Sequence, residues 1–191
     1  ISASAEGTTT TRAIVEGSAV ETATVAEGVE VVGDRTFRKC SNLQTITLPN
    51  TLTEIQSGAF QSCSALTSVT IPAGVTTIGD QAFYGCSALT QVNIPEGVTR
   101  IEASAFRALA VEEMTVPASV TYIGQFAFRE NYKMRRLYIL SENIDTIETN
   151  AFLWASNPDP TATLTIYVKN QAVKEKVEAA ITQAKMFVEI M

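Results

Sequence analysis

Three cysteines combine reactive chemistry with a regular spacing in this chain. Cys40, Cys63 and Cys86 follow one another at intervals of 23 residues. Thiols can bind metals, form disulfides or act as nucleophiles, but the chain has no histidine, the commonest metal ligand and general base. If the spacing reflects stacked repeats, parallel side chains about 5 Å apart are badly oriented for a disulfide. We therefore expect three buried, unreactive thiols and no metal or cofactor.

The acidic residues offer little to catalysis. Glu112 and Glu113 are consecutive, so on a strand they point to opposite sides and cannot flank one bond. Asp145 and Glu148 lie three residues apart without a visible partner, whereas glycoside hydrolysis needs two facing carboxyl groups. Trp154, the single tryptophan, is expected in the core, with a sugar platform as the alternative. The sequence therefore predicts a protein that is not an enzyme.

The acidic charge balance restricts the partners. The chain of 191 residues carries 20 acidic and 14 basic residues, a formal net charge of -6. Nucleic acids and anionic membranes attract clustered lysine and arginine, so neither is expected as a partner. No apolar run approaches the roughly 20 residues that span a bilayer, and no signal peptide is visible among the residues. We expect no direct membrane insertion.

The cysteine spacing belongs to a repeat that covers most of the chain. The segment GVTTIGDQAFYGCSALTQVNIPE (74–96) closely matches TLTEIQSGAFQSCSALTSVTIPA (51–73), and GVTRIEASAF (97–106) begins another copy. Self-similarity at a fixed period of this length is the signature of a solenoid. A phenylalanine recurs in every unit, at positions Phe37, Phe60, Phe83, Phe106, Phe128 and Phe152.

Each unit is predicted to contain one short strand and one short helical turn. Apolar and polar residues alternate over 66–71, which is typical of a half-buried strand, and Pro72 ends it. The segment QAFYGCS (81–87) is too short for an independent helix, so we expect one or two helical turns held down by Phe83. Because such a unit cannot bury its apolar side alone, the units must stack, phenylalanine on phenylalanine.

The chain is predicted to form one domain with three parts. Residues 1–18 form a loose N-terminal tail or cap, residues 19–168 form the solenoid, and residues 169–191 form a C-terminal capping helix and strand. A loop is expected at Pro158–Pro160, and the last repeat strand at Leu164–Val168. Asn170 is expected to cap a helix that covers the end of the stack, with a short strand over Phe187–Met191. The apolar residues expected on one side of that helix are Val173, Val177, Ala180, Ile181, Ala184 and Phe187.

The repeat unit is similar to the BspA-like leucine-rich repeats. The pattern I-G-x-x-A-F-x-x-C-x-x-L-x-x-V-x-I-P is carried by Ile78–Pro95 and by several near copies in register. The resemblance covers Val20 to about Met191, including a C-terminal segment similar to the family's closing strand and capping helix. It departs at Leu109 and Asn131, where cysteine is expected, and at Leu140, where proline is expected. The resemblance implies an α/β fold: a right-handed leucine-rich-repeat solenoid of about six units, with a parallel concave sheet, short helical turns on the other side and a C-terminal capping helix.

The polar positions of the predicted strands form the candidate binding face, because they alternate with core positions and line the open, concave side. In the C-terminal half, small hydroxyl residues give way to Glu113, Arg136 and Tyr138. A solvated β surface with cross-strand ion pairs and a binding face with interface anchors both remain open. The candidate residues are Ser68, Thr70, Gln91, Asn93, Glu113, Thr115, Arg135, Arg136 and Tyr138.

The resemblance also implies a function. It indicates an exported or cell-surface bacterial protein, outer-membrane anchored or secreted, that binds other macromolecules, sometimes host extracellular-matrix proteins. We therefore predict a non-catalytic binding module for protein–protein contact or adhesion, with a protein or a surface glycan as partner. The alternative is a structural spacer within a larger envelope assembly, and carbohydrate binding is less favoured.

Overall fold

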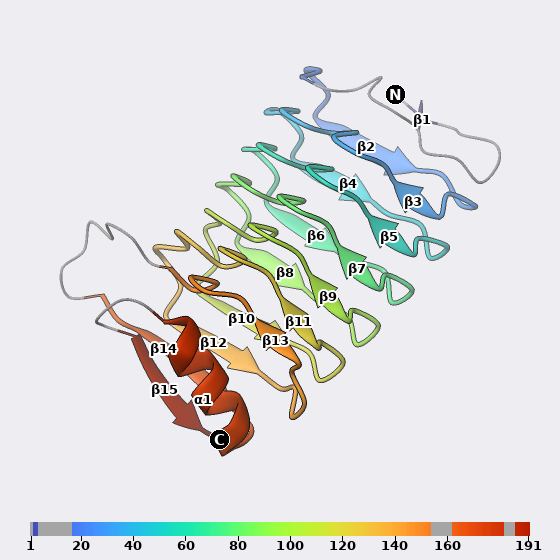
Figure 1. The fold of residues 1–191 in the computed structure, drawn as a ribbon. Helices are drawn as coiled ribbons and strands as arrows, with labels where there is room; N and C mark the ends of the chain where they lie inside the picture. Colours follow the sequence, from blue (N-terminus) through green and yellow to red (C-terminus); the bar gives the residue numbers. More distant parts are fainter. Residues whose placement is uncertain (1, 4–16, 154–161, 182–185) are drawn as a thin grey trace.

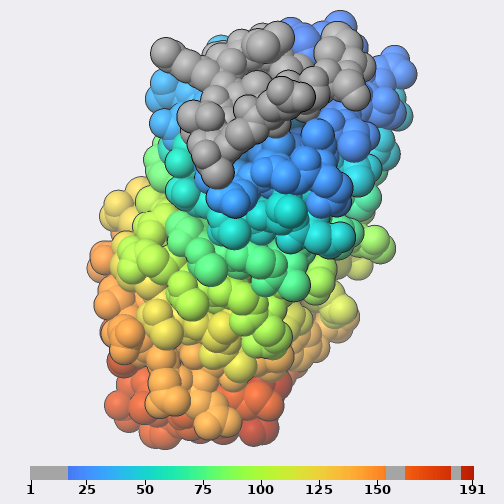
Figure 2. Space-filling view, turned by 90° about the vertical axis from the view of Figure 1, so that its right-hand side faces the viewer, coloured from blue at the N-terminus to red at the C-terminus, as the bar shows by residue number. Residues whose placement is uncertain are grey.

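The computed structural model describes residues 2–3, 17–153, 162–181 and 186–191. Over these residues the chain winds into a β-solenoid of about seven turns, against about six expected, and every described strand pair is parallel (Figure 1). Figure 2 shows the coils as successive layers from the N-terminal to the C-terminal end. Trp154, the loop at Pro158–Pro160 and most of the predicted N-terminal tail lie outside the described residues.

One side of the solenoid carries the longer strands, which form three separate sheets. The strand orders are β1-β2-β4, then β6-β8, then β10-β12-β14-β15. We call the solvent-exposed side of β2 to β14 in this series the strand face. The strands are β1 (Ser2–Ala3), β2 (Thr22–Val25), β4 (Thr45–Thr47), β6 (Ser68–Thr70), β8 (Gln91–Asn93), β10 (Glu113–Val116), β12 (Arg136–Ile139), β14 (Leu164–Val168) and β15 (Met186–Ile190).

A second set of two-residue strands forms one uninterrupted sheet, the short-strand sheet. Its order is β13-β11-β9-β7-β5-β3, so each coil pairs with the next without a break. Each of these strands directs an aliphatic residue inward, such as Ile55, Ile78 and Ile101, all fully buried. The strands are β3 (Val31–Val32), β5 (Glu54–Ile55), β7 (Thr77–Ile78), β9 (Arg100–Ile101), β11 (Tyr122–Ile123) and β13 (Thr146–Ile147).

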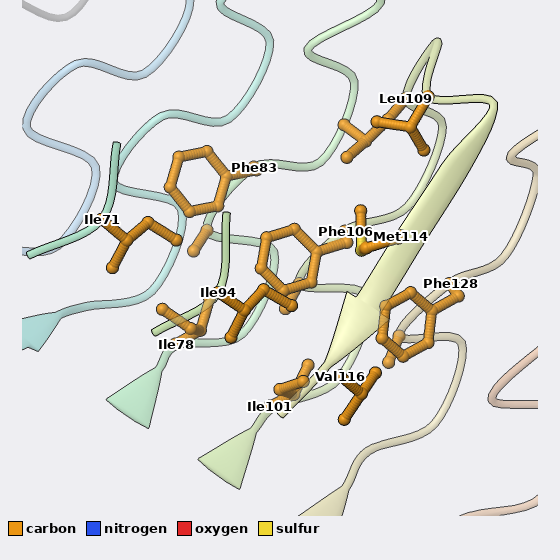
Figure 3. Packing of buried hydrophobic residues seen from close by; sticks show 14 of the residues in the cluster. Ile71, Ile78, Phe83, Ile94, Ile101, Phe106, Leu109, Met114, Val116 and Phe128 are labelled. Atoms are coloured by element: carbon orange, nitrogen blue, oxygen red, sulfur yellow. The ribbon is translucent and has the colours of Figure 1, made fainter. Parts of the chain in front are cut away.

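The phenylalanines form one continuous internal stack, as the repeat predicts. Neighbouring ring centroids lie 5.2–5.9 Å apart, with interplanar angles of 3–17°. All six rings are at most 2% exposed. Figure 3 shows Phe83, Phe106 and Phe128 in succession, with Ile94, just after β8, and Val116 of β10 packed beside them. The stack therefore joins every coil from the first full unit to the last.

The prediction of short helical turns beside the phenylalanines is wrong. Around the first five phenylalanines of the stack, the residues two before and two after the ring have positive φ, for example Gln81 (55°) and Gly85 (75°) around Phe83. A left-handed residue at every fourth position prevents a right-handed helix. Instead, the backbone N–H of Phe60 donates to the carbonyl of Ala82 in the next coil at 2.8 Å. The turn side is therefore also bonded from coil to coil.

The C-terminal helix begins as predicted and ends earlier. Helix α1 spans Gln171–Ala180, and the side chain of Asn170 accepts a hydrogen bond from the N–H of Val173 at 2.9 Å. The predicted continuation of its apolar side to Phe187 is wrong, because Phe187 lies on β15, which pairs with β14 and leaves that side chain 54% exposed. The predicted closing strand is confirmed and begins one residue earlier, at Met186.

Helix α1 packs against the end of the short-strand sheet. Its buried residues are Val173, Val177 and Ala180. The carbonyl of Ala180 accepts a hydrogen bond from the N–H of Asn150 at 3.1 Å. The ammonium of Lys176 donates to the carbonyls of Ile144 and Asp145, just before β13. These contacts attach the helix to the last coil.

Truncation of one stacked ring should destabilise the protein strongly. We expect Phe83→Ala to lower the free energy of unfolding by about 3–5 kcal/mol, because it removes buried area and leaves a cavity between two rings. Phe187→Ala is the matched control on an exposed ring and should change stability by less than about 0.5 kcal/mol. Urea denaturation of both variants measures the difference, and similar values for the two would contradict the stacked core.

Candidate functional site

The candidate residues lie where the predicted strands place them. Each strand contributes two outward positions, and the register pairs Ser68 with Gln91, Thr70 with Asn93, Glu113 with Arg136, and Thr115 with Tyr138. All of these side chains are exposed except that of Tyr138, which is half-buried. The remaining candidate, Arg135, lies just before β12. Its guanidinium donates hydrogen bonds to the backbone carbonyls of Tyr132 and Met134 at 2.9 and 3.2 Å.

One predicted ion pair is present on the strand face. The guanidinium of Arg136 donates to the carboxylate of Glu113 at 3.0 and 3.1 Å, across β10 and β12. This hydrogen bond raises the pKa of Arg136. Both side chains remain more than half exposed, so the pair orients two charged groups on the surface rather than contributing much to stability.

The structure adds an aromatic pair that the sequence analysis missed. Tyr138 of β12 and Tyr167 of β14 stack with ring centroids 5.0 Å apart and an interplanar angle of 13°. Phe187 lies on the next strand, β15, opposite Thr165. Alignment of Arg136–Ile139 with Thr165–Val168 places the two tyrosines at the same repeat position, so the signal was present in the sequence.

The strand face is interrupted between β8 and β10. These strands belong to different sheets, whereas β9 and β11 of the same coils remain paired. The break coincides with a shortened repeat: Phe106 and Phe128 are 22 residues apart, and the missing residue falls between Leu109 and Ala110, just before β10. The series is also interrupted between β4 and β6, where the repeat keeps its full 23 residues. The N–H of Ala110 donates to the carbonyl of Leu89 at 3.0 Å. We call this boundary between β8 and β10 the seam.

A depression of about 640 Å³ opens at the seam. Its floor is aliphatic and consists of Val92, Ala110 and Met114. Val92 is only half-buried, whereas Met114 and the equivalent Val69 are 2% and 4% exposed. The interruption of the sheet therefore uncovers core-side carbon atoms on the strand face.

Polar side chains surround this floor. Gln91, Asn93 and Thr115 contribute uncharged hydrogen-bonding groups. The charged members of the lining are Glu112, Glu113, Lys133 and Arg136. The expectation that Glu112 and Glu113 point to opposite sides is wrong, because Glu112 precedes β10 and both residues border the same depression. The seam depression thus gathers five of the predicted candidates, while Glu112 and Lys133 are additional residues. The five are Gln91, Asn93, Glu113, Thr115 and Arg136.

The cysteines serve the core rather than the strand face. All three are free and buried, which confirms the predicted burial. The thiols of Cys63 and Cys86 donate to the carbonyls of Phe37 and Phe60 in the preceding coil, at 3.0 and 3.1 Å. Burial raises the pKa of Cys40. The pKa of Cys63 is also raised, mainly by hydrogen bonding with Cys86 and, to a smaller extent, by burial.

Asn131 replaces a cysteine and makes the same bond between coils. Its amide nitrogen donates to the carbonyl of Phe106 at 2.9 Å, as the thiols do to their phenylalanines. Its amide oxygen also accepts from the N–H of Leu109 at 2.7 Å. The departure from the repeat at this position therefore satisfies two backbone groups of the shortened coil.

Two further structural facts bear on function. Within the described ranges, no three residues among the cysteines and acidic side chains are grouped in a way that could hold a metal ion. Among the described residues, no helix has the length and apolar character that crossing a bilayer requires.

Comparison with known families gives a direct match. The BspA type leucine rich repeat region matches in six copies, over residues 9–135 and 55–166. The chain belongs to the BspA-type leucine-rich repeat family. No curated protein matches the chain.

Solved structures share the fold of this BspA-type chain. A leucine rich cell surface protein from Faecalibacterium prausnitzii is 27% identical, with a TM-score of 0.62, over 82% of this chain and 51% of that one. A leucine-rich repeat protein from Bacteroides ovatus is 20% identical, with a TM-score of 0.54, over 85% and 55%. The Treponema pallidum leucine rich repeat protein is 17% identical, with a TM-score of 0.50, over 95% and 65%. The BspA-type chain thus spans about half the length of the first two structures.

The thiols should be unreactive in the native protein. All three thiols are buried away from reagents, and the raised pKa of Cys40 and Cys63 also keeps those two out of the reactive thiolate form. We expect alkylation by iodoacetamide at pH 7.5 to modify none of the three cysteines in the native protein and all three after denaturation without reductant. Mass spectrometry counts the adducts. Fewer than three adducts in the denatured protein would reveal a disulfide and contradict the assignment of three free thiols.

Loss of the Asn131 side chain should destabilise the coil next to the seam. Asn131→Ala leaves the N–H of Leu109 and the carbonyl of Phe106 without this buried partner, so we expect a loss of about 2–4 kcal/mol in unfolding free energy. Asn143→Ala, at an exposed asparagine, is the control and should be nearly neutral. Chemical denaturation compares them, and equal effects would show that the bonds to Asn131 contribute nothing specific.

Proposed function

We propose that the chain is a non-catalytic binding module of a bacterial surface or exported protein, and that it binds a protein partner through the C-terminal half of the strand face. Membership of a repeat family that is typically non-catalytic supports this proposal. So does the fold shared with a cell surface protein of Faecalibacterium prausnitzii. A host extracellular-matrix protein is one candidate partner, and an exported location, secreted or anchored in an outer membrane, follows from the same proposal.

The observation that carries the proposal is the group of aromatic and arginine residues on β12, β14 and β15. Tyr138 and Tyr167 are stacked and half-buried, so little conformational freedom remains to be lost when a partner packs against them. Arg136 and the exposed ring of Phe187 lie on the same side of this sheet. Tyrosine and arginine are enriched among residues that dominate binding energy at protein interfaces.

The N-terminal half of the strand face lacks these anchors. Its outward positions on β4 and β6 are threonine and serine, namely Thr45, Thr47, Ser68 and Thr70. Threonine is a good strand former, and its presence there requires no partner. We therefore assign binding to the C-terminal half and treat the N-terminal half as a solvated surface.

Two architectural features complete the proposal. The winding is right-handed, as parallel strands joined by crossover connections are in almost all proteins. Helix α1 closes the C-terminal end of the short-strand sheet and so acts as the cap that stacked repeats require.

Binding should depend on the tyrosine pair. Immobilised fibronectin, laminin, fibrinogen and collagen, with a glycan array in parallel, serve as probes for the purified protein. We expect capture by at least one protein, and we expect Tyr138→Ala and Tyr167→Ala each to weaken it by about tenfold or more. Tyr84→Ala, on the turn side of the solenoid, is the matched control and should bind like the wild type.

Three outcomes would contradict the proposal. Capture by glycans alone would move the function to carbohydrate binding. Equal losses in Tyr84→Ala and Tyr138→Ala would show that the strand face has no special role. No capture by any probe would favour the structural spacer.

A further inference from the structure

We infer that the seam depression receives an extended peptide segment of the protein partner, with one aliphatic side chain on its floor and charged residues of opposite sign on either side. This inference rests on the proposed function and specifies the partner's chemistry. It concerns a different part of the strand face from the tyrosine pair, because neither Tyr138 nor Tyr167 lines the depression.

The floor selects an aliphatic side chain. Val92 is half-buried and presents carbon atoms to solvent, beside the buried Ala110 and Met114, at the only interruption between β6 and β12 in the part of the chain that the structure describes. In the two adjacent coils the residues equivalent to Val92 are covered, since Val69 is 4% exposed and Met114 is 2% exposed. An aliphatic side chain of the ligand placed here covers the carbon atoms of Val92 and removes them from water.

The rim selects charges of both signs. Glu113 and Arg136 already neutralise each other at 3.0 Å. The side chains of Glu112 and Lys133 make no hydrogen bond or ion pair with any described residue, and both are exposed. One carboxylate and one ammonium therefore remain available, and they complement a basic and an acidic residue of the ligand.

The same features disfavour a glycan in this depression. Sugar rings pack on open aromatic faces, and the floor contains no aromatic residue. The nearest aromatic side chains on the strand face, Tyr138 and Tyr167, turn their rings toward each other. The four charged residues of the lining sum to zero net charge, so they do not attract a polyanionic chain either. By contrast, the amides of Gln91 and Asn93 match the alternating donors and acceptors of a peptide backbone.

The test uses short peptides and nuclear magnetic resonance of the ¹⁵N-labelled protein. The probes are blocked pentapeptides Gly-Lys-Leu-Glu-Gly, its reverse Gly-Glu-Leu-Lys-Gly, and the uncharged Gly-Gln-Leu-Gln-Gly, with cellohexaose and chitohexaose as sugars. The side-chain amide signals of Gln91 and Asn93 report occupancy directly. We expect at least one charged peptide to shift both signals and to bind more tightly than the uncharged peptide, and we expect the sugars to leave the signals unchanged.

Variants separate the contribution of the Glu112 charge from that of the shape of the depression. Glu112→Gln should weaken the charged peptide by roughly two- to fivefold, the range of an exposed charge contact, and should leave the uncharged peptide unaffected. Glu96→Gln removes an exposed carboxylate outside the depression, just after β8, and should change nothing. Thr115→Trp on one wall, and Asn93→Trp on the other, fill the depression and should abolish the peptide-induced shift of Gln91.

The results distinguish this inference from the proposed function. Absence of peptide-induced shifts, or shifts caused by a sugar instead, would overturn the inference. If Thr115→Trp and Asn93→Trp both capture the protein partner as well as the wild type while Tyr138→Ala does not, the inference fails and the proposed function stands. Loss of partner capture in both tryptophan variants, with the fold intact by circular dichroism, supports the inference.

Discussion

The structure depends on one constraint, which is that no coil can cover its own apolar side. Each full repeat unit contributes one phenylalanine, and the six rings stack 5.2–5.9 Å apart along the solenoid. Backbone hydrogen bonds join neighbouring coils along the short-strand sheet and along the turns. Neighbouring coils are thereby held on two sides at a nearly fixed spacing, and the strand side is the one place where the register can vary.

In the shortened coil the strand register changes, and this change is visible on the strand face. With one residue missing before β10, the phenylalanine stack and the short-strand sheet continue unbroken, while the ladder between β8 and β10 is lost. Asn131 satisfies the backbone groups left on the core side. On the outer side, the change uncovers Val92 and coincides with the transition from hydroxyl to charged and aromatic residues. The shortened repeat thus coincides with the depression at the seam.

Most of the fold could be predicted from periodicity, because the position of each phenylalanine and of each alternating strand is explicit in the sequence. The helical turns could not, because only Gly58 and Gly85 mark the left-handed positions, and residues such as Gln81 and Phe126 adopt the same φ without a sequence signal. The strand-face residues were predictable from alternation. Their grouping around the seam was not, because it depends on where the sheet breaks. Tyr167 was detectable by aligning its strand with that of Tyr138.

The most direct test of the stacking constraint is removal of one whole coil. Deletion of residues 74–96 joins Ala73 to Gly97 and preserves the repeat register, so the account predicts a folded protein that unfolds cooperatively with reduced stability. Deletion of residues 74–84, about half a coil, removes Phe83 and shifts every following position, and should leave the chain unfolded. Circular dichroism during urea denaturation compares the two. Equal stability of both deletions, or loss of folding in both, would contradict the claim that the coils stack as interchangeable units.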